Sequence, residues 1–179
     1  MEHDLIVRLQ QEYSDELFEQ LYRLYADRAI RTAAAITGSA ASAADVVQET
    51  FIRVYRNLGS YDLDRPFEPW FYRILYNECN RYLKKQARMV PSEISEEKDL
   101  PSETDTYEFD RHGEVYEMVQ QLDDKHRIPV ILKYLNDLAE KDIAELMDLN
   151  VNTVKSRLFQ ARKKLKEWVL NRGGEFHGS

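Results

Sequence analysis

The sequence has few of the residues that build disulfide-linked, turn-rich or membrane-spanning proteins. Cys79 is the one cysteine among 179 residues, which excludes an internal disulfide and a cysteine-rich zinc site. Six glycines and five prolines leave little material for the tight turns of a β-sandwich. No apolar run approaches the roughly 18 residues that a membrane helix needs, and the start MEHDLIVRLQ lacks the pattern of a signal peptide. We therefore expect a cytoplasmic protein.

The motifs of the common enzyme classes are also missing. The sequence contains no phosphate-binding glycine loop, no HExxH zinc motif and no nucleophile elbow. Its four histidines are spread along the chain and, with one cysteine, do not form a metal-binding pattern. We expect a protein that is not an enzyme and that needs no cofactor, metal ion or small-molecule substrate.

Acidic residues outnumber basic ones, but the excess is confined to one segment. The net charge is −7, from 32 acidic and 25 basic residues. Ten of the acids and two of the bases lie between residues 92 and 117, so the remainder of the chain is close to neutral. Because charge asymmetry within a chain is more informative than its sum, the acidic total does not exclude nucleic acid as a partner.

Helical periodicity, without a convincing alternating strand pattern, predicts an all-α fold. The chain divides into two small helical domains, residues 1–90 and 113–170, which are joined by a flexible acidic linker, residues 91–112. The linker contains two prolines and most of the acid excess. Residues 171–179 are expected to form a disordered tail.

Two helices of the first domain can be delimited from their end signals. Ser42 is predicted to cap a helix from Ala43 to Leu58, and Gly59 is predicted to follow its end. A loop with Pro66 and Pro69 then precedes a long helix over residues 70–88.

The helix over residues 70–88 carries a basic and amide-bearing stripe opposite its apolar face. The stripe follows the helical period of 3.6 residues and comprises Arg73, Asn77, Asn80, Lys84 and Arg88. Asparagine amides can donate and accept hydrogen bonds at a base edge, and the cations suit phosphates. Nearby aromatic rings could stack on unpaired bases, although their spacing fits core residues equally well.

A second basic helix follows a tight turn near the C-terminus. A short helix over residues 139–149, with Asp137 as a possible cap, leads into the turn MDLN, in which Asp148 is expected to be left-handed and Asn150 to cap the next helix. Six bases against one acid lie between residues 152 and 168. This order is typical of a helix-turn-helix, whose second helix enters the major groove. Phe159 stands outside the apolar stripe and could pack on a thymine methyl. A solvated basic helix in a small bundle would give the same pattern.

Three segments together resemble a known family. In order, DVVQETFIRVYRNL (45–58), EPWFYRILYNECNRYLKK (68–85) and IAELMDLNVNTVKSRLFQARKKLK (143–166) are similar to regions two and four of bacterial extracytoplasmic-function (ECF) RNA polymerase sigma factors of the sigma-70 family. The resemblance covers both predicted domains. Asp148 departs from the glycine that is usual in the turn, and Ala139-Glu140-Lys141 departs from the usual Ser/Tyr-containing start of the preceding helix.

The resemblance implies an RNA polymerase sigma factor that binds the core enzyme, directs promoter-specific initiation and assists strand opening. The implied partners are the β′ and β subunits of the core polymerase, promoter DNA in duplex and melted single-stranded form, and an anti-sigma factor that is often membrane-anchored. The acidic linker resembles the segment that threads the RNA path of the polymerase. We also expect this linker to screen the basic helices and so to lower DNA affinity in the free protein.

The resemblance also implies three groups of contact residues. Core polymerase would contact the helix that bears Asp45, Gln48, Glu49, Ile52 and Arg53. The minus-ten element would contact the loop and long helix that bear Tyr61, Phe67, Arg73, Asn77, Asn80, Arg81 and Lys84. The minus-thirty-five element would contact the second helix of the helix-turn-helix, through Asn152, Thr153, Lys155, Ser156, Arg157, Phe159, Gln160, Arg162 and Lys163.

Three other functions compete with this interpretation. A plain operator-binding regulator would explain the helix-turn-helix but leaves the helices over 45–58 and 70–88 unexplained. An anti-sigma factor or adaptor would be a helical interaction module, and those of the zinc-binding kind need clustered His and Cys, which are missing. An enzyme would need one of the motifs excluded above.

Overall fold

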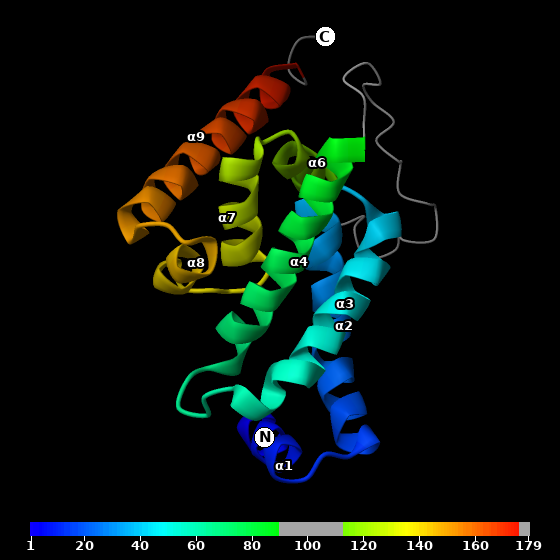
Figure 1. Ribbon diagram of the computed structural model, residues 1–179. Helices are drawn as coiled ribbons and strands as arrows, with labels where there is room; N and C mark the ends of the chain where they lie inside the picture. The colour runs from blue at the N-terminus through cyan, green and yellow to red at the C-terminus, as the bar shows by residue number, and fades with distance from the viewer. Residues whose placement is uncertain (90–112, 176–179) are drawn as a thin grey trace. The chain divides into compact units, whose positions relative to one another are not determined.

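The computed structural model describes residues 1–89 and 113–175, with side chains up to residue 172. The described residues form helices and no strand, and the helices make two compact units, one before and one after residues 90–112 in the sequence (Figure 1). We call residues 1–89 unit 1 and residues 113–175 unit 2. The predicted all-α fold with two helical domains is confirmed, whereas the predicted linker lies outside the described residues. No helix in these two ranges is long and apolar enough to cross a membrane.

Unit 1 is built around three long helices, with a short one at its start. Its elements are α1 (Glu2–Gln11), α2 (Asp15–Thr37), α3 (Ala40–Asn57), a 3-10 turn (Leu58–Ser60) and α4 (Phe67–Met89). Helices α2, α3 and α4 pack on one another. Large side chains from all three are fully buried between them, including Leu21, Val54, Phe71 and Tyr72. Unit 1 therefore has a hydrophobic core of its own.

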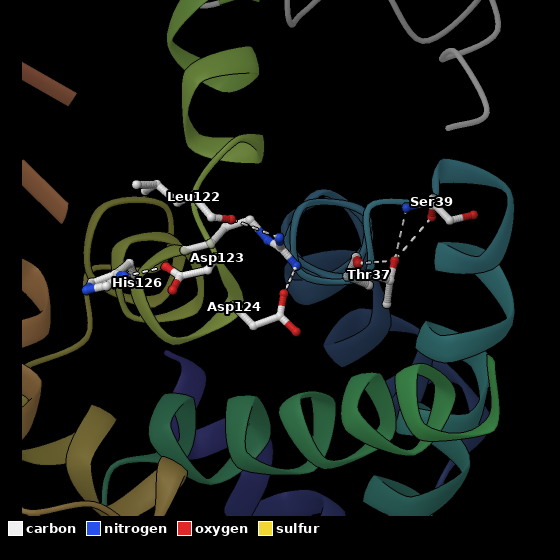
Figure 2. Close-up of polar contacts among 8 residues, drawn as sticks. Thr37, Ser39, Leu122, Asp123, Asp124 and His126 are labelled. Atoms are coloured by element: carbon white, nitrogen blue, oxygen red, sulfur yellow. Dashed lines mark hydrogen bonds and ion pairs between the residues drawn. The ribbon is translucent and has the colours of Figure 1, made fainter. Parts of the chain in front are cut away.

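The start of α3 differs from the predicted one. Gly38 ends α2 in the left-handed conformation, with φ 72°, and Ser39 caps α3 by accepting a hydrogen bond from the Ser42 N–H at 3.3 Å. Ser39 also donates its backbone N–H to the Thr37 hydroxyl (Figure 2). The prediction that Ser42 is the cap was wrong, because the residue directly after the left-handed glycine has the extended backbone that a cap needs. Ser42 lies in the first turn, and its hydroxyl donates to Tyr82 of α4 at 2.6 Å.

The end of α3 and the start of α4 also differ from the sequence prediction. Gly59 lies inside the 3-10 turn instead of serving as a left-handed terminator. Helix α4 begins at Phe67, three residues before Trp70. Pro69 is accommodated in its first turn, where a backbone N–H has no intrahelical partner.

Unit 2 packs four helices around a second core. They are α6 (Gly113–Gln120), α7 (Asp124–Tyr134), α8 (Glu140–Met147) and α9 (Val151–Glu175). Leu132 of α7, Ile143 of α8 and the α9 residues Val154 and Leu158 are fully buried. The short helix, turn and longer helix that the sequence predicted are therefore held together by one apolar centre.

The predicted caps, turn residue and helix end of unit 2 agree with the structure only in part. Asp148 has φ 55° and the Asn150 side chain accepts the Asn152 N–H at 2.8 Å, so both predictions are confirmed. Asp137 does not cap α8: it adopts φ 57° in the preceding loop, and Ala139 occupies the cap position without a side-chain hydrogen bond. Helix α9 continues to Glu175, so residues 171–175 are helical and not the start of a disordered tail.

A nearly buried carboxylate links α3 to α4. Glu78 of α4 is 5% exposed and forms an ion pair with Arg53 of α3, with Arg81 at 3.6 Å. Arg53 also lies 3.5 Å from Glu49, on the more exposed side of the pair. A buried carboxylate without a cation is costly, so Glu78 fixes the position of the Arg53 guanidinium.

Replacing Glu78 should destabilise unit 1 more than replacing Glu49. Glu78→Ala removes the buried partner of Arg53, and we expect a loss of roughly 1–3 kcal/mol in the free energy of unfolding. Glu49→Ala is the matched control and should cost under about 0.5 kcal/mol, because its carboxylate is solvated. Urea unfolding monitored by circular dichroism measures both, and equal effects would contradict the role of Glu78.

Replacing Asp148 with glycine should stabilise unit 2. A left-handed non-glycine residue carries a steric cost, so Asp148→Gly should raise the free energy of unfolding by up to about 1 kcal/mol. Lys166→Gly, in the interior of α9, is the control and should lower it by about 1 kcal/mol. Thermal unfolding of the two variants gives the comparison, and a destabilised Asp148→Gly variant would show that the Asp148 side chain has a stabilising contact.

Candidate functional site

An exposed apolar face lies where α2 packs on α3. Ile52 of α3 is 37% exposed, and Tyr22 of α2 and Tyr55 of α3 are also exposed. Tyr22 packs at a tilt against Phe51 with ring centroids 4.7 Å apart, and Tyr55 contacts Tyr13 edge-on at 5.1 Å. We call Tyr22, Ile52 and Tyr55 the α2–α3 face. Exposed apolar residues on two helices that pack together are typical of an interaction surface.

All five residues predicted to contact polymerase lie on α3 outside its buried stripe. Asp45 and Gln48 are exposed on α3, and Glu49 is half-buried. Arg53 is also half-buried and engaged with Glu49 and Glu78. The sequence analysis missed Tyr22 and Tyr55, although both fall outside the buried stripes of their helices and could have been found by the same periodicity.

The loop between α3 and α4 is held in place from α1. The Gln10 amide donates to the backbone carbonyls of Leu58, at 2.8 Å, and Tyr61, at 2.7 Å. The Tyr61 hydroxyl donates to the Arg65 carbonyl, and the Asp62 carboxylate accepts the Asp64 N–H at 3.0 Å. Hydrogen bonds from both ends therefore define the backbone of residues 61–65. Sequence analysis gave no signal for Gln10, which is 51 residues from Tyr61.

Two aromatic residues predicted to contact DNA are core residues: Tyr61 in this loop and Phe67 at the start of α4. Tyr61 and Phe67 are 7% and 5% exposed, and each packs against Trp70, with centroids 4.9 and 5.4 Å apart. Burial also raises the pKa of Tyr61. The sequence left open whether these rings are core residues or stack on unpaired bases. Because both are buried, they support the loop, and their faces are not free for a base.

The polar stripe of α4 lies along one side of unit 1. Arg73, Asn77, Arg81 and Lys84 are exposed, and Asn80 is half-buried. Steps of three and four residues place these side chains on neighbouring turns of the helix. Amides and cations thus share a surface about three turns long, which suits a nucleic-acid strand.

Helix α9 presents a second polar surface. Phe159 is 59% exposed, which confirms that it is outside the core. Arg162 donates to the Tyr134 hydroxyl of α7 at 3.0 Å. Of the other predicted contacts, Thr153 and Arg157 are half-buried, whereas the exposed ones are Asn152, Lys155, Ser156, Gln160 and Lys163. All nine predicted residues therefore lie outside the buried stripe of α9.

A depression lies between α9 and the first turn of α7. Asn152, Ser156 and Arg157 of α9 line it together with Lys125 and His126 of α7. The Asp123 carboxylate contacts Nδ1 of His126, and this contact lowers the pKa of Asp123 (Figure 2). The sequence analysis considered His126 only as a metal ligand and missed its position beside α9. Within the described ranges, no group of three or more His, Cys, Asp or Glu could hold a metal ion.

Both units match families of known proteins. Sigma-70 region 2 matches residues 21–89, and sigma-70 region 4 matches residues 112–165. The ECF RNA polymerase sigma-E factor of Haemophilus influenzae is 33% identical over 142 residues, which cover 70% of this chain and 73% of that protein. The ECF RNA polymerase sigma factor SigW of Bacillus subtilis is 28% identical over 166 residues, covering 85% of this chain and 88% of SigW.

Solved structures show the same fold at lower sequence identity. CnrH, in complex with the cytosolic domain of CnrY, superposes with a TM-score of 0.70 at 23% identity, covering 93% of this chain and 96% of CnrH. The sigma factor RpoE of Bartonella quintana, in complex with the anti-sigma factor NepR, gives 0.67 at 21% identity, covering 85% and 96%. Since both sigma-70 regions match in order and a relative at 33% identity aligns over most of its length, the protein belongs to the ECF family of RNA polymerase sigma factors, which direct promoter-specific transcription initiation.

Proposed function

We propose that three surfaces of this sigma factor divide the work of initiation: the α2–α3 face binds core polymerase, α4 and the loop before it bind the minus-ten element, and α9 binds the minus-thirty-five element. The observation that carries the proposal is the exposure of Phe159 among cations on the second helix of a helix-turn-helix. An exposed phenylalanine lowers solubility unless it has a partner, and a thymine methyl in the major groove is such a partner. The protein thus acts by binding, in keeping with its family of non-catalytic initiation factors.

The polymerase contact is assigned to α3 and its neighbour α2. Ile52, Tyr22 and Tyr55 supply an apolar centre, and Asp45, Gln48 and Glu49 supply a polar rim. This combination is typical of a protein–protein interface. Arg53 contributes to it through the Glu78 ion pair, which holds the guanidinium beside Glu49.

The minus-ten contact is assigned to the polar stripe of α4 and to the loop at residues 62–65. Asn77 and Asn80 can read base edges, while Arg73, Arg81 and Lys84 neutralise phosphates. Flipping a base out of the duplex costs a few kcal/mol, which a preformed loop and nearby cations must offset. Tyr61 and Phe67 act as the support of the loop in this proposal and make no stacking contact.

The minus-thirty-five contact is assigned to α9 lying in the major groove. Lys155, Ser156, Phe159 and Gln160 would face base edges, and Arg157, Arg162 and Lys163 would hold phosphates. Asn152 and Thr153 lie at the N-terminal end of the helix, which is the part that enters the groove.

We further propose that an anti-sigma factor regulates the protein by covering the α2–α3 face. The support comes from the exposed apolar residues of that face and from the similar fold of RpoE, which was solved with its anti-sigma factor NepR. Covering Ile52, Tyr22 and Tyr55 would exclude polymerase from the same residues.

Reconstituted transcription tests the assignment to initiation. Bacterial core RNA polymerase is incubated with fragmented genomic template, with and without the protein, and start sites are mapped. We expect discrete start sites that depend on the protein, because a sigma factor supplies promoter choice. Binding to core polymerase without any new start site would instead indicate a polymerase-binding regulator. If the protein neither bound core polymerase nor produced new start sites, an operator-binding regulator would become the leading explanation.

A single substitution tests the polymerase contact. Ile52→Glu places a charge on the α2–α3 face and should weaken core binding at least about 10-fold, the effect expected when an apolar interface residue that contributes strongly is replaced by a charge. Leu24→Glu is the control, since Leu24 is exposed on the opposite side of α2 from Tyr22 and should leave binding unchanged. Titration of fluorescently labelled protein with core polymerase measures both, and equal affinities would refute the assignment.

A further inference from the structure

The depression between α7 and α9 contains a histidine that the proposed contacts leave unused. His126 is 7% exposed, yet it lines the depression beside Asn152, Ser156 and Arg157 of α9. Lys125, from the same turn of α7, lines it as well. A nearly buried polar ring at the edge of a nucleic-acid-binding helix needs a chemical explanation, because most buried polar side chains have a partner on every polar atom.

One ring nitrogen of His126 has a partner, and the other is aimed elsewhere. Nδ1 contacts the Asp123 carboxylate, and Nε2 lies at the opposite end of the ring, away from Asp123 (Figure 2). The contacts within the described residues give Nε2 no hydrogen-bond partner. When Nδ1 donates its proton to a carboxylate, protonation of the ring places a second N–H on Nε2. Asp123 therefore orients His126 as a potential donor to an outside acceptor.

The charges around His126 favour an anion as that acceptor. Lys125 and Arg157 line the depression, and none of the described lining residues is a carboxylate. Asp123 faces Nδ1, and Lys164 of α9 lies close enough to lower the pKa of Asp123. A protonated His126 would meet two cations on its open side, so an anion there would relieve repulsion as well as accept a hydrogen bond.

We infer that this depression holds one backbone phosphate of the minus-thirty-five duplex, bound by Lys125, Arg157 and protonated His126, and that promoter affinity consequently rises as pH falls. The inference rests on the proposed placement of α9 in the major groove, since phosphates flank a helix in that position. It adds the first turn of α7 to the DNA-binding surface. It also makes one of the phosphate contacts dependent on protonation.

The test compares holoenzymes that differ only at His126. Core polymerase is assembled with the full-length wild-type protein or with His126→Leu, and the affinity of each for one promoter fragment is measured by fluorescence anisotropy between about pH 5.5 and 8, the range in which histidine changes charge. The ratio of the two affinities at each pH cancels the pH dependence of the core enzyme. We expect the wild type to bind roughly 3- to 10-fold tighter than the variant at the acidic end and about equally at the basic end, since one charge-assisted contact is lost.

A second pair of variants tests whether the pH dependence comes from His126 and its partner Asp123 and not from another histidine. Asp123→Asn keeps a hydrogen-bonding partner for Nδ1 but removes its charge, so the rise in affinity should move to lower pH. His3→Gln replaces an exposed histidine of α1 and should reproduce the wild-type profile. Thermal unfolding at each pH checks that His126→Leu and Asp123→Asn leave unit 2 folded.

The outcomes separate this inference from the proposed function. A wild-type profile in His126→Leu, or a ratio that does not change with pH, would overturn the phosphate contact while leaving promoter binding intact. Absence of any promoter-specific complex with the wild-type protein would overturn both. Independent support would come from the slope of log affinity against log salt concentration at acidic pH. This slope should be steeper for the wild type than for His126→Leu by about the contribution of one phosphate contact.

Discussion

Each surface that this protein offers to a partner is fixed by the burial of the opposite side of the same helix. Most of the stability of a protein helix comes from packing, so each helix here must bury an apolar stripe to persist. Burying Val47, Phe51 and Val54 on α3 leaves Gln48 and Ile52 outside. In the same way, the buried stripe of α9 forces the cationic side chains and Phe159 outward. The surfaces proposed to contact polymerase and DNA are thus consequences of two small cores.

The same constraint explains why much of the fold could be predicted from sequence. Hydrophobic periodicity records which stripe is buried, so the all-α fold and the exposure of Phe159 and Ile52 followed directly. Asp148 and Asn150 were also predictable, because a left-handed turn residue and a cap act within a few residues of themselves. These are local features, and local sequence encodes them.

The features that sequence did not predict depend on contacts between distant residues. Glu78 looks like any surface carboxylate until α3 brings Arg53 beside it, and Gln10 has no role until the loop 51 residues away is in place. Whether Tyr61 and Phe67 were core or contact residues could not be decided from spacing, since a ring on a helix stripe or a nearby loop fits both. The Ser42 cap failed for a different reason: two candidate serines compete, and the preceding Gly38 decides between them.

For the proposed contact with the minus-ten element, buried rings at Tyr61 and Phe67 are more favourable than exposed rings would be. A flexible loop would lose conformational entropy when it captured a base, and this loss would add to the few kcal/mol that flipping costs. Here Gln10 fixes two carbonyls, and Tyr61 closes the loop onto Arg65, so the backbone of residues 61–65 is ordered when unit 1 folds. The free energy that orders the loop comes from packing Tyr61 and Phe67 against Trp70. Contacts with a flipped base would then need to offset only the cost of melting and not the cost of ordering the loop. This is the advantage of a preorganised site.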